Sequence, residues 1–334
     1  MRYFMSYLDA EFLEDFFKQK PTNVESDGEE LEIWRHWLRF IRDKSDIDLT
    51  VTVDSTDLSY NINTAFTREL IDGYLQGKEH ISINSKKLDS VTARDLVVNS
   101  EKPTFIFRNK LQNAEITEEK TGFCCIDGTS FFEKWQHYFK AKSYAISKST
   151  VPNQLEKWSD LFLDYRYPSN AFVIVDNYIF NYKPNINNNL LKIIKEILQS
   201  SKNVKTEIDL IIVSEHFYKE NGENEVSIDK LHNEIIRYLR NFSILNVNLC
   251  LVKAKYHDRL ILSNYFVMDS GNSFNYFGSD GSTVLNQNTH LSLTPLTSDY
   301  SKINAYKNEL SDIIEQSQEY KGTKKNRLLK SLLT

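Results

Sequence analysis

The chain has 334 residues, of which 40% are hydrophobic and 13% aromatic, and its formal net charge is -5. This composition excludes a disordered chain, because there is enough apolar surface to form a core. The negative charge excludes a protein whose whole surface binds nucleic acid, although it permits a local basic patch. The length predicts two domains, which we place at residues 1–150 and 151–334.

Targeting and metal-binding patterns are missing from the sequence. No run approaches the roughly 18 apolar residues of a membrane span, and the N-terminal segment meets acidic residues too early for a secretory signal. Three cysteines, Cys124, Cys125 and Cys250, lack a metal-binding spacing, so we expect buried thiols and no metal or other cofactor. We therefore expect a cytoplasmic protein, bacterial by its Asn-, Lys- and Ile-rich composition, with no membrane partner.

The first half mixes helical and strand patterns. Expected elements are helices within 9–44 around a loop at 21–30, a strand at 47–55, a helix at 65–77, short strands between 80 and 130, and a helix at 131–139. One helical run carries Trp34 and Trp37 on one side and arginines on the other. It has two interpretations: the tryptophans belong to the core, or they stack on nucleic-acid bases.

The second half alternates strands and helices more regularly. Strands are predicted at 171–180 and 206–217, and a strand or strand pair at 246–262, with helices at 189–200 and 228–242 between them. This order predicts an α/β domain whose sheet is covered by helices on both faces. Ligands of such sheets sit off the strand ends, and Asp176, Glu215 and His216 fall there.

The run at 254–277 is the clearest candidate site. If its first part is extended, one face carries Lys253, Lys255, His257 and Arg259, while Asp258 points to the other. An imidazole beside three cations is suited to an anion such as phosphate. Downstream, a Gly, Ser and Asn cluster supplies a flexible backbone, a hydroxyl and an amide that could close over the same anion.

These residues resemble the motif of the phospholipase D superfamily, which is HxK, then an aspartate, then GSxN. His257 matches the histidine, Arg259 stands at the lysine position and Asn264 at the aspartate spacing. Residues 271–275 approximate GSxN with one residue inserted. The resemblance covers about residues 171–290, and it implies that 151–334 is a phospholipase D-like mixed sheet covered by helices on both faces, with a C-terminal helix and basic tail.

The resemblance implies a division of roles. In the superfamily one histidine attacks the phosphodiester and forms a phosphohistidine, and a second histidine motif protonates the leaving oxygen. The expected catalytic residue here is His257. The expected phosphate ligands are Lys255, Arg259, Ser273 and Asn275, and the expected supporting residues are Asn264, Asp258 and Glu215. No second HxK or HxR occurs in the chain, so catalysis would need a homodimer.

Three functions remain open from the sequence. HDR in place of HxK is similar to degenerate phospholipase D-like domains of bacterial defence proteins, which predicts a phosphate- or nucleic-acid-binding subunit of an anti-phage defence assembly. The alternatives are a metal-independent nuclease or phosphodiesterase, and a non-catalytic subunit that binds a protein partner. A purely structural cluster of His257, Asp258 and Arg259 is also compatible with the pattern.

The C-terminus combines an amphipathic helix at 303–320 with a basic segment. The segment KGTKKNRLLK, residues 321–330, carries five basic residues and no acidic one. Such a run is either a solvated tail or a contact for a nucleic-acid backbone.

Overall fold

The chain divides into two compact units, Met1–Phe139 and Lys140–Thr334. The computed structural model describes residues 2–21, 28–51, 65–84, 102–109, 111, 114–147, 154–163, 167–199, 207–220, 224–240, 244–252, 259–283, 288–299, 301–323 and 326–329. The expected boundary at 150 falls inside the second unit. The reason is that strand β6 (Lys142–Ile146) pairs with strand β14 (Thr289–Pro295), which the local sequence pattern does not reveal.

The first unit contains a five-stranded parallel sheet in the order β3-β2-β1-β4-β5. Its strands are β1 (Phe4–Asp9), β2 (Ser45–Thr50), β3 (Ile81–Asn84), β4 (Thr104–Arg108) and β5 (Cys124–Asp127). Its helices are α1 (Ala10–Lys18), α2 (Gly28–Lys44), α3 (Ala65–Leu75), α5 (Ala114–Thr121) and α6 (Phe131–Phe139). Every neighbouring pair of these strands is parallel.

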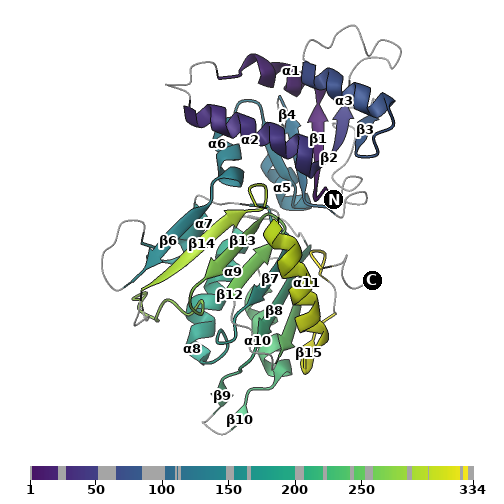
Figure 1. Cartoon of the computed structure of the whole chain (residues 1–334). Coiled ribbons are helices and arrows are strands. Elements are labelled where there is room, and N and C mark those ends of the chain that lie inside the picture. Colours follow the sequence, from purple (N-terminus) through teal and green to yellow (C-terminus); the bar gives the residue numbers. More distant parts are fainter. Residues whose placement is uncertain are drawn as a thin grey trace. The chain divides into compact units, whose positions relative to one another are not determined.

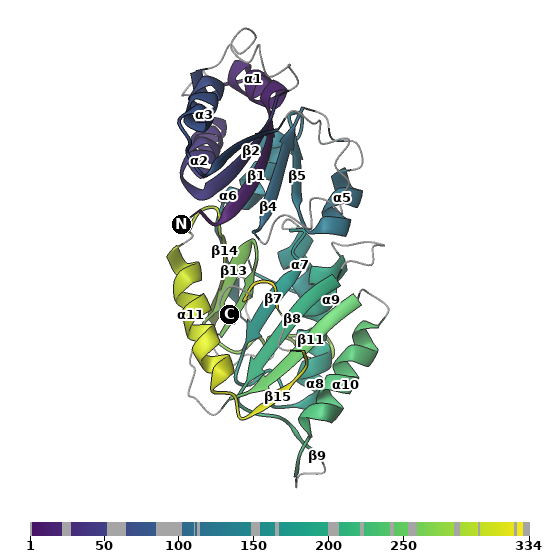
Figure 2. The ribbon, with the colours of Figure 1, turned by 90° about the vertical axis from the view of Figure 1, so that its right-hand side faces the viewer.

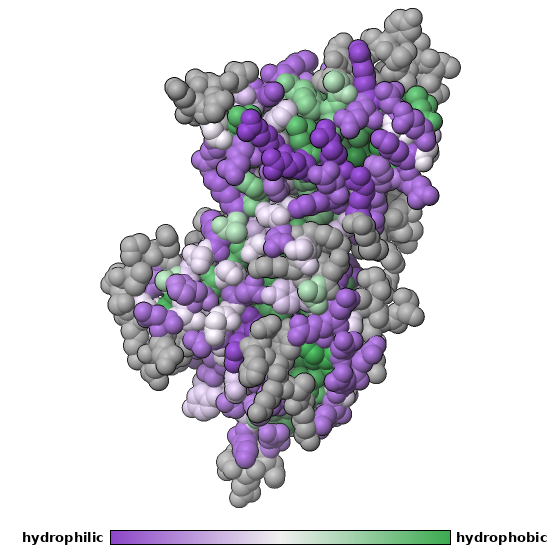
Figure 3. Space-filling view, in the orientation of Figure 1, coloured by the Kyte–Doolittle hydropathy of each residue, from purple (hydrophilic) through white to green (hydrophobic). Residues whose placement is uncertain are grey.

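The tryptophans of α2 belong to the core of this unit. Trp34 is 6% exposed and Trp37 is fully buried, and the ring of Phe16 from α1 lies 4.3 Å from that of Trp37. Figure 3 shows hydrophilic side chains over the outer side of α2. The core interpretation of this helix is therefore confirmed.

The central strand β1 precedes the first element expected from the sequence, which begins at residue 9. This strand lies between β2 and β4. One of its inward-facing residues is Ser6, which is fully buried and whose hydroxyl donates to Ser45 Oγ at 2.9 Å. A buried serine interrupts the apolar alternation that identifies a strand in a sequence.

The second unit contains an eight-stranded mixed sheet in the order β15-β11-β8-β7-β12-β13-β14-β6. Its other strands are β7 (Ala171–Val175), β8 (Glu207–Ser214), β11 (Ile244–Leu251), β12 (Arg259–Ser263), β13 (Phe266–Ser270) and β15 (Glu319–Lys321), with a separate small hairpin of β9 (Lys219–Glu220) and β10 (Asn224–Glu225). Strands β7, β8 and β11 are parallel, and β12 to β14, β6 and β15 are antiparallel to their neighbours.

Helices cover both faces of this sheet. They are α7 (Trp158–Leu163), α8 (Lys183–Asn185), α9 (Leu191–Gln199), α10 (Ile228–Leu239) and α11 (Ser301–Glu315), with a π-helical turn at Ile186–Leu190 between α8 and α9. Figures 1 and 2 together show α11 on one face and α9 and α10 on the other. The α/β class and the mixed sheet with helices are confirmed. None of the described helices is both long and apolar enough to cross a membrane.

The segment at 246–262, predicted as one strand or a strand pair, contains parts of two strands that are not neighbours in the sheet. Strand β11 ends at Leu251 and β12 begins at Arg259, and β8 and β7 lie between them in the sheet. Residues 253–258 lie outside the described part of the chain. A continuous run of strand-forming residues therefore does not imply a single strand.

The basic C-terminal segment is partly built into the second unit. Lys321 Nζ lies 2.6 Å from Asp229 Oδ1, and Arg327 Nε lies 3.1 Å from Asp209 Oδ2. Leu328 and Leu329 are buried, and β15 pairs with β11. Two of the five basic residues thus pair with carboxylates of the same unit, and the other three lie outside the described residues.

Candidate functional site

Four strand ends meet at one edge of the second sheet. Asp176 directly follows β7 and Glu215 directly follows β8, which are parallel neighbours. Because β12 runs antiparallel to β7, its first residue, Arg259, lies beside the end of β7 and opposite Ser270 at the end of β13. This is the edge at which open α/β sheets bind ligands.

Asp176 fastens two loops to each other at this edge. Its fully buried carboxylate accepts hydrogen bonds from the Tyr178 backbone N at 2.9 Å, from Ser273 Oγ at 2.8 Å and from the Phe274 backbone N at 2.6 Å. Burial raises the pKa of the Asp176 carboxyl, and these hydrogen bonds and the Arg259 charge oppose that rise. The loop after β13 is therefore fixed to the loop after β7.

Ser273 and Asn275, predicted as phosphate ligands, are used in this fastening. Because the Ser273 hydroxyl donates to Asp176, the same proton cannot also reach a phosphate. Asn275 Nδ2 donates to the Tyr178 carbonyl oxygen at 2.8 Å. Asn275 Oδ1 is buried and has no hydrogen-bond partner among the described residues. Both residues therefore hold the loop after β13 in position beside the loop after β7.

Arg259 and His216 both lie close to one exposed tyrosine. The guanidinium carbon of Arg259 is 5.8 Å from the centre of the Tyr178 ring, and the His216 ring is also 5.8 Å from it. Tyr178 is 39% exposed. His216 Nε2 lies 3.7 Å from Glu215 Oε2. A permanent cation and an imidazole thus lie near one aromatic ring, and a carboxylate lies beside the imidazole; a cation and a ring in this arrangement can hold an anion and an attached planar group.

Asn264 is not part of this group. It lies in the turn between β12 and β13, at the opposite end of β12 from Arg259. Its Nδ2 donates to Asn170 Oδ1 at 2.9 Å, and its Oδ1 accepts from the Asn170 backbone N at 3.3 Å. Asn264 is 8% exposed, so its amide serves the packing of two turns and does not support a site at the other edge.

The remaining predicted residues, Lys255, His257 and Asp258, lie outside the described residues. The structure brings together Arg259, Ser273, Asn275 and Glu215, and the expected role of His257 stays a prediction. Among the described residues, no group of three or more His, Cys, Asp or Glu side chains is placed to hold a metal ion. The three cysteines are buried thiols, as expected.

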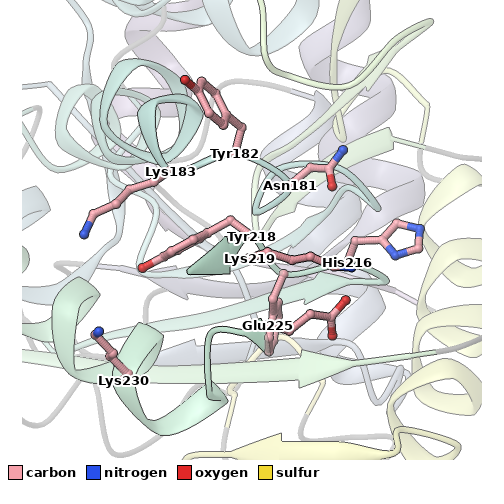
Figure 4. Close-up of a pocket in the computed structure, with 9 residues that line it drawn as sticks. Asn181, Tyr182, Lys183, His216, Tyr218, Lys219, Glu225 and Lys230 are labelled. Atoms are coloured by element: carbon pink, nitrogen blue, oxygen red, sulfur yellow. The ribbon is translucent and has the colours of Figure 1, made fainter. Parts of the chain in front are cut away.

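A hollow of about 810 Å³ opens next to this edge. It is lined by residues 181–183 after β7, residues 216–219 after β8, Glu225 of the β9–β10 hairpin and Lys230 of α10 (Figure 4). His216 belongs both to the hollow and to the group around Tyr178. The two features are therefore continuous.

Sequence reasoning missed Tyr178, Tyr182 and Lys183, which follow β7. The available signal was their position in DNYIFNYK, because Tyr178 lies at the end of the predicted strand at 171–180 and Tyr182 and Lys183 follow it.

No protein-family model matches the chain, and no curated protein matches its sequence.

Proposed function

We propose that the chain binds a phosphate-bearing ligand, in particular nucleic acid, at the Arg259 edge of its second unit. The observation that carries the proposal is a half-buried guanidinium held at the carboxyl ends of parallel strands, 5.8 Å from the ring of an exposed tyrosine. Arginine keeps its charge at all physiological pH values, and its planar fork suits phosphate oxygens.

The carboxylate of Asp176 supports this function, and it is turned toward the loops and not toward the ligand. Both oxygens of Asp176 accept hydrogen bonds from loop donors, which keeps that carboxylate turned toward the loops. The loops that frame Arg259 are consequently fixed before a ligand arrives. A prearranged cation loses less conformational entropy on binding than a mobile one.

Residues that precede Arg259 in the sequence also belong to the proposed site. On the basis of the resemblance to the phospholipase D superfamily, Lys255 remains a proposed phosphate contact, Asp258 a proposed supporting residue, and His257 the proposed catalytic residue if the chain is a phosphodiesterase. The same resemblance supports a degenerate, binding-only member that serves as a cytoplasmic subunit of a bacterial defence assembly. Ser273 and Asn275 act by positioning the loop after β13.

The experiment is fluorescence anisotropy with a labelled single-stranded oligonucleotide at several salt concentrations. Arg259→Gln is expected to weaken binding about tenfold and to lower the salt slope by about 0.7, the value for one lost phosphate contact on a single strand. The matched control is Arg237→Gln, which changes an exposed arginine of α10 and should leave both values unchanged. A wild-type protein that binds no nucleic acid would contradict the proposal and favour a protein-interaction subunit.

A phosphodiesterase is the second candidate, and the pair of His216 and Glu215 favours it. A carboxylate 3.7 Å from an imidazole can orient the ring for proton transfer. The test is hydrolysis of a nitrophenyl phosphodiester in excess chelator, with His257→Gln and His216→Gln beside the wild type. Turnover that survives both substitutions would exclude a phosphohistidine mechanism with these groups.

A further inference from the structure

The hollow beside the Arg259 edge has the chemistry of a nucleoside site. Tyr182 stands at its rim and is 63% exposed, and Tyr218 lines its interior. In Figure 4 the hydroxyl end of Tyr218 lies between Lys183 and Lys230, while His216 and Glu225 lie on the other side. Aromatic faces interleaved with lysines are the combination that binds the bases and backbone of single strands.

Two exposed aromatic rings lie here. Among the residues that the structure describes, four tyrosines are exposed, and two of them, Tyr178 and Tyr182, lie in the short loop after β7. An exposed aromatic ring can offer a π-face for stacking, and each base stacked on such a ring strengthens binding. The loop therefore places one ring beside Arg259 and one at the hollow.

Two of the three lysines of the hollow lie near carboxylates. Lys183 Nζ lies 3.6 Å from Glu234 Oε1, and Lys219 is the cross-strand neighbour of Glu225 in the β9–β10 hairpin. Lys183 also lies 5.8 Å from the centre of the Tyr218 ring. A duplex needs a cationic track along its backbone, whereas one base and its sugar can be taken up by a hollow of this kind.

We infer that this hollow takes the base and sugar of one nucleotide of a single strand, whose neighbouring phosphate lies at Arg259. This inference rests on the proposed phosphate site and names its substrate class. The inference depends on the link between Arg259 and the hollow: Arg259 and His216 both lie near the Tyr178 ring, and His216 also lines the hollow. A base paired inside a duplex cannot enter the hollow, so single strands are bound in preference to duplexes.

The test measures the anisotropy of a labelled oligothymidylate with the intact chain. Tyr182→Ala is expected to weaken binding about tenfold, the scale of one lost stacking contact, and Tyr182→Phe should bind like the wild type. Tyr74→Ala, which changes a tyrosine of the first unit that is 43% exposed, is the matched control and should change nothing. A duplex of the same length should bind more weakly, and its affinity should be the same for Tyr182→Ala as for the wild type.

Arg259→Gln, measured in parallel, separates the two proposals. If Arg259→Gln weakens binding and Tyr182→Ala does not, the nucleoside site is wrong and the phosphate site stands. If neither substitution has an effect, both proposals are wrong. Equal losses for single strand and duplex with Tyr182→Ala would also overturn the nucleoside site. Circular dichroism spectra that match the wild type confirm that the variants are folded.

Discussion

The guanidinium carbon of Arg259 lies 5.8 Å from the centre of the Tyr178 ring, which is within the range of a cation–π interaction. The arginine begins β12, and the tyrosine belongs to the loop after β7. Tyr178 is held through its backbone, whose N–H donates to Asp176 and whose carbonyl accepts from Asn275. Its ring is therefore free to be changed without losing those hydrogen bonds.

Tyr178→Ala is expected to weaken oligonucleotide binding about three- to tenfold, because the guanidinium loses a cation–π contact of about 0.5 to 1 kcal/mol and the strand loses a stacking surface. Titration calorimetry measures this change. Tyr178→Phe keeps the ring and should stay within a factor of two of the wild type. Full affinity in Tyr178→Ala would show that Arg259 needs no aromatic neighbour.

The buried carboxyl of Asp176 predicts a specific pH dependence of stability. Burial raises its pKa in the folded state above the unfolded value of about 3.9. Its contribution to stability is therefore full below about pH 4 and is lost as pH rises through the folded pKa. Asp176→Asn has no such titration, although it costs about 1 to 3 kcal/mol at all pH values by disturbing a buried hydrogen bond.

Urea unfolding of both proteins between about pH 4 and pH 7 measures this difference. The stability advantage of the wild type over Asp176→Asn should shrink as pH rises. If the advantage grows instead, the three hydrogen bonds and Arg259 outweigh burial, and the pKa of Asp176 is lowered in the folded state.

The ion pair between Arg327 and Asp209 predicts that Arg327 stabilises the second unit. Asp209 Oδ2 accepts from the Arg327 backbone N at 2.8 Å and from its Nε at 3.1 Å, and the Asp209 side chain is only 8% exposed. Asp209→Ala should lower the free energy of unfolding by about 2 kcal/mol. Lys321→Ala, which removes an exposed pair with Asp229, should cost less than about 1 kcal/mol. Thermal unfolding compares the two, and equal losses would contradict this assignment.

Local pattern was sufficient for much of the second unit. The apolar runs that became β7 and β8, and the amphipathic run that became α10, were predicted within a few residues. The pairing of β6 with β14 was not predicted. It joins segments that are far apart in the sequence, and it depends on sheet register. For the same reason the local pattern at 246–262 does not decide between one strand and a strand pair: its two halves enter the sheet on opposite sides of β8 and β7.

The sequence was sufficient to name several residues of the candidate site, but not the contacts that they make. Arg259 and the Ser273 to Asn275 segment were found from residue type and spacing, and the structure places them at one edge. That the Ser273 hydroxyl serves Asp176 depends on a contact between two distant loops, which spacing cannot show. Asn264 was assigned by spacing alone, yet a five-residue strand carries it to the opposite edge.

A crystal structure of the protein with a short 5′-phosphorylated oligothymidylate tests the central claim most directly. The account predicts a phosphate oxygen within about 3 Å of the Arg259 guanidinium, with a neighbouring base in the hollow beside Tyr182. A strand bound at another surface, with no phosphate at Arg259, would contradict it.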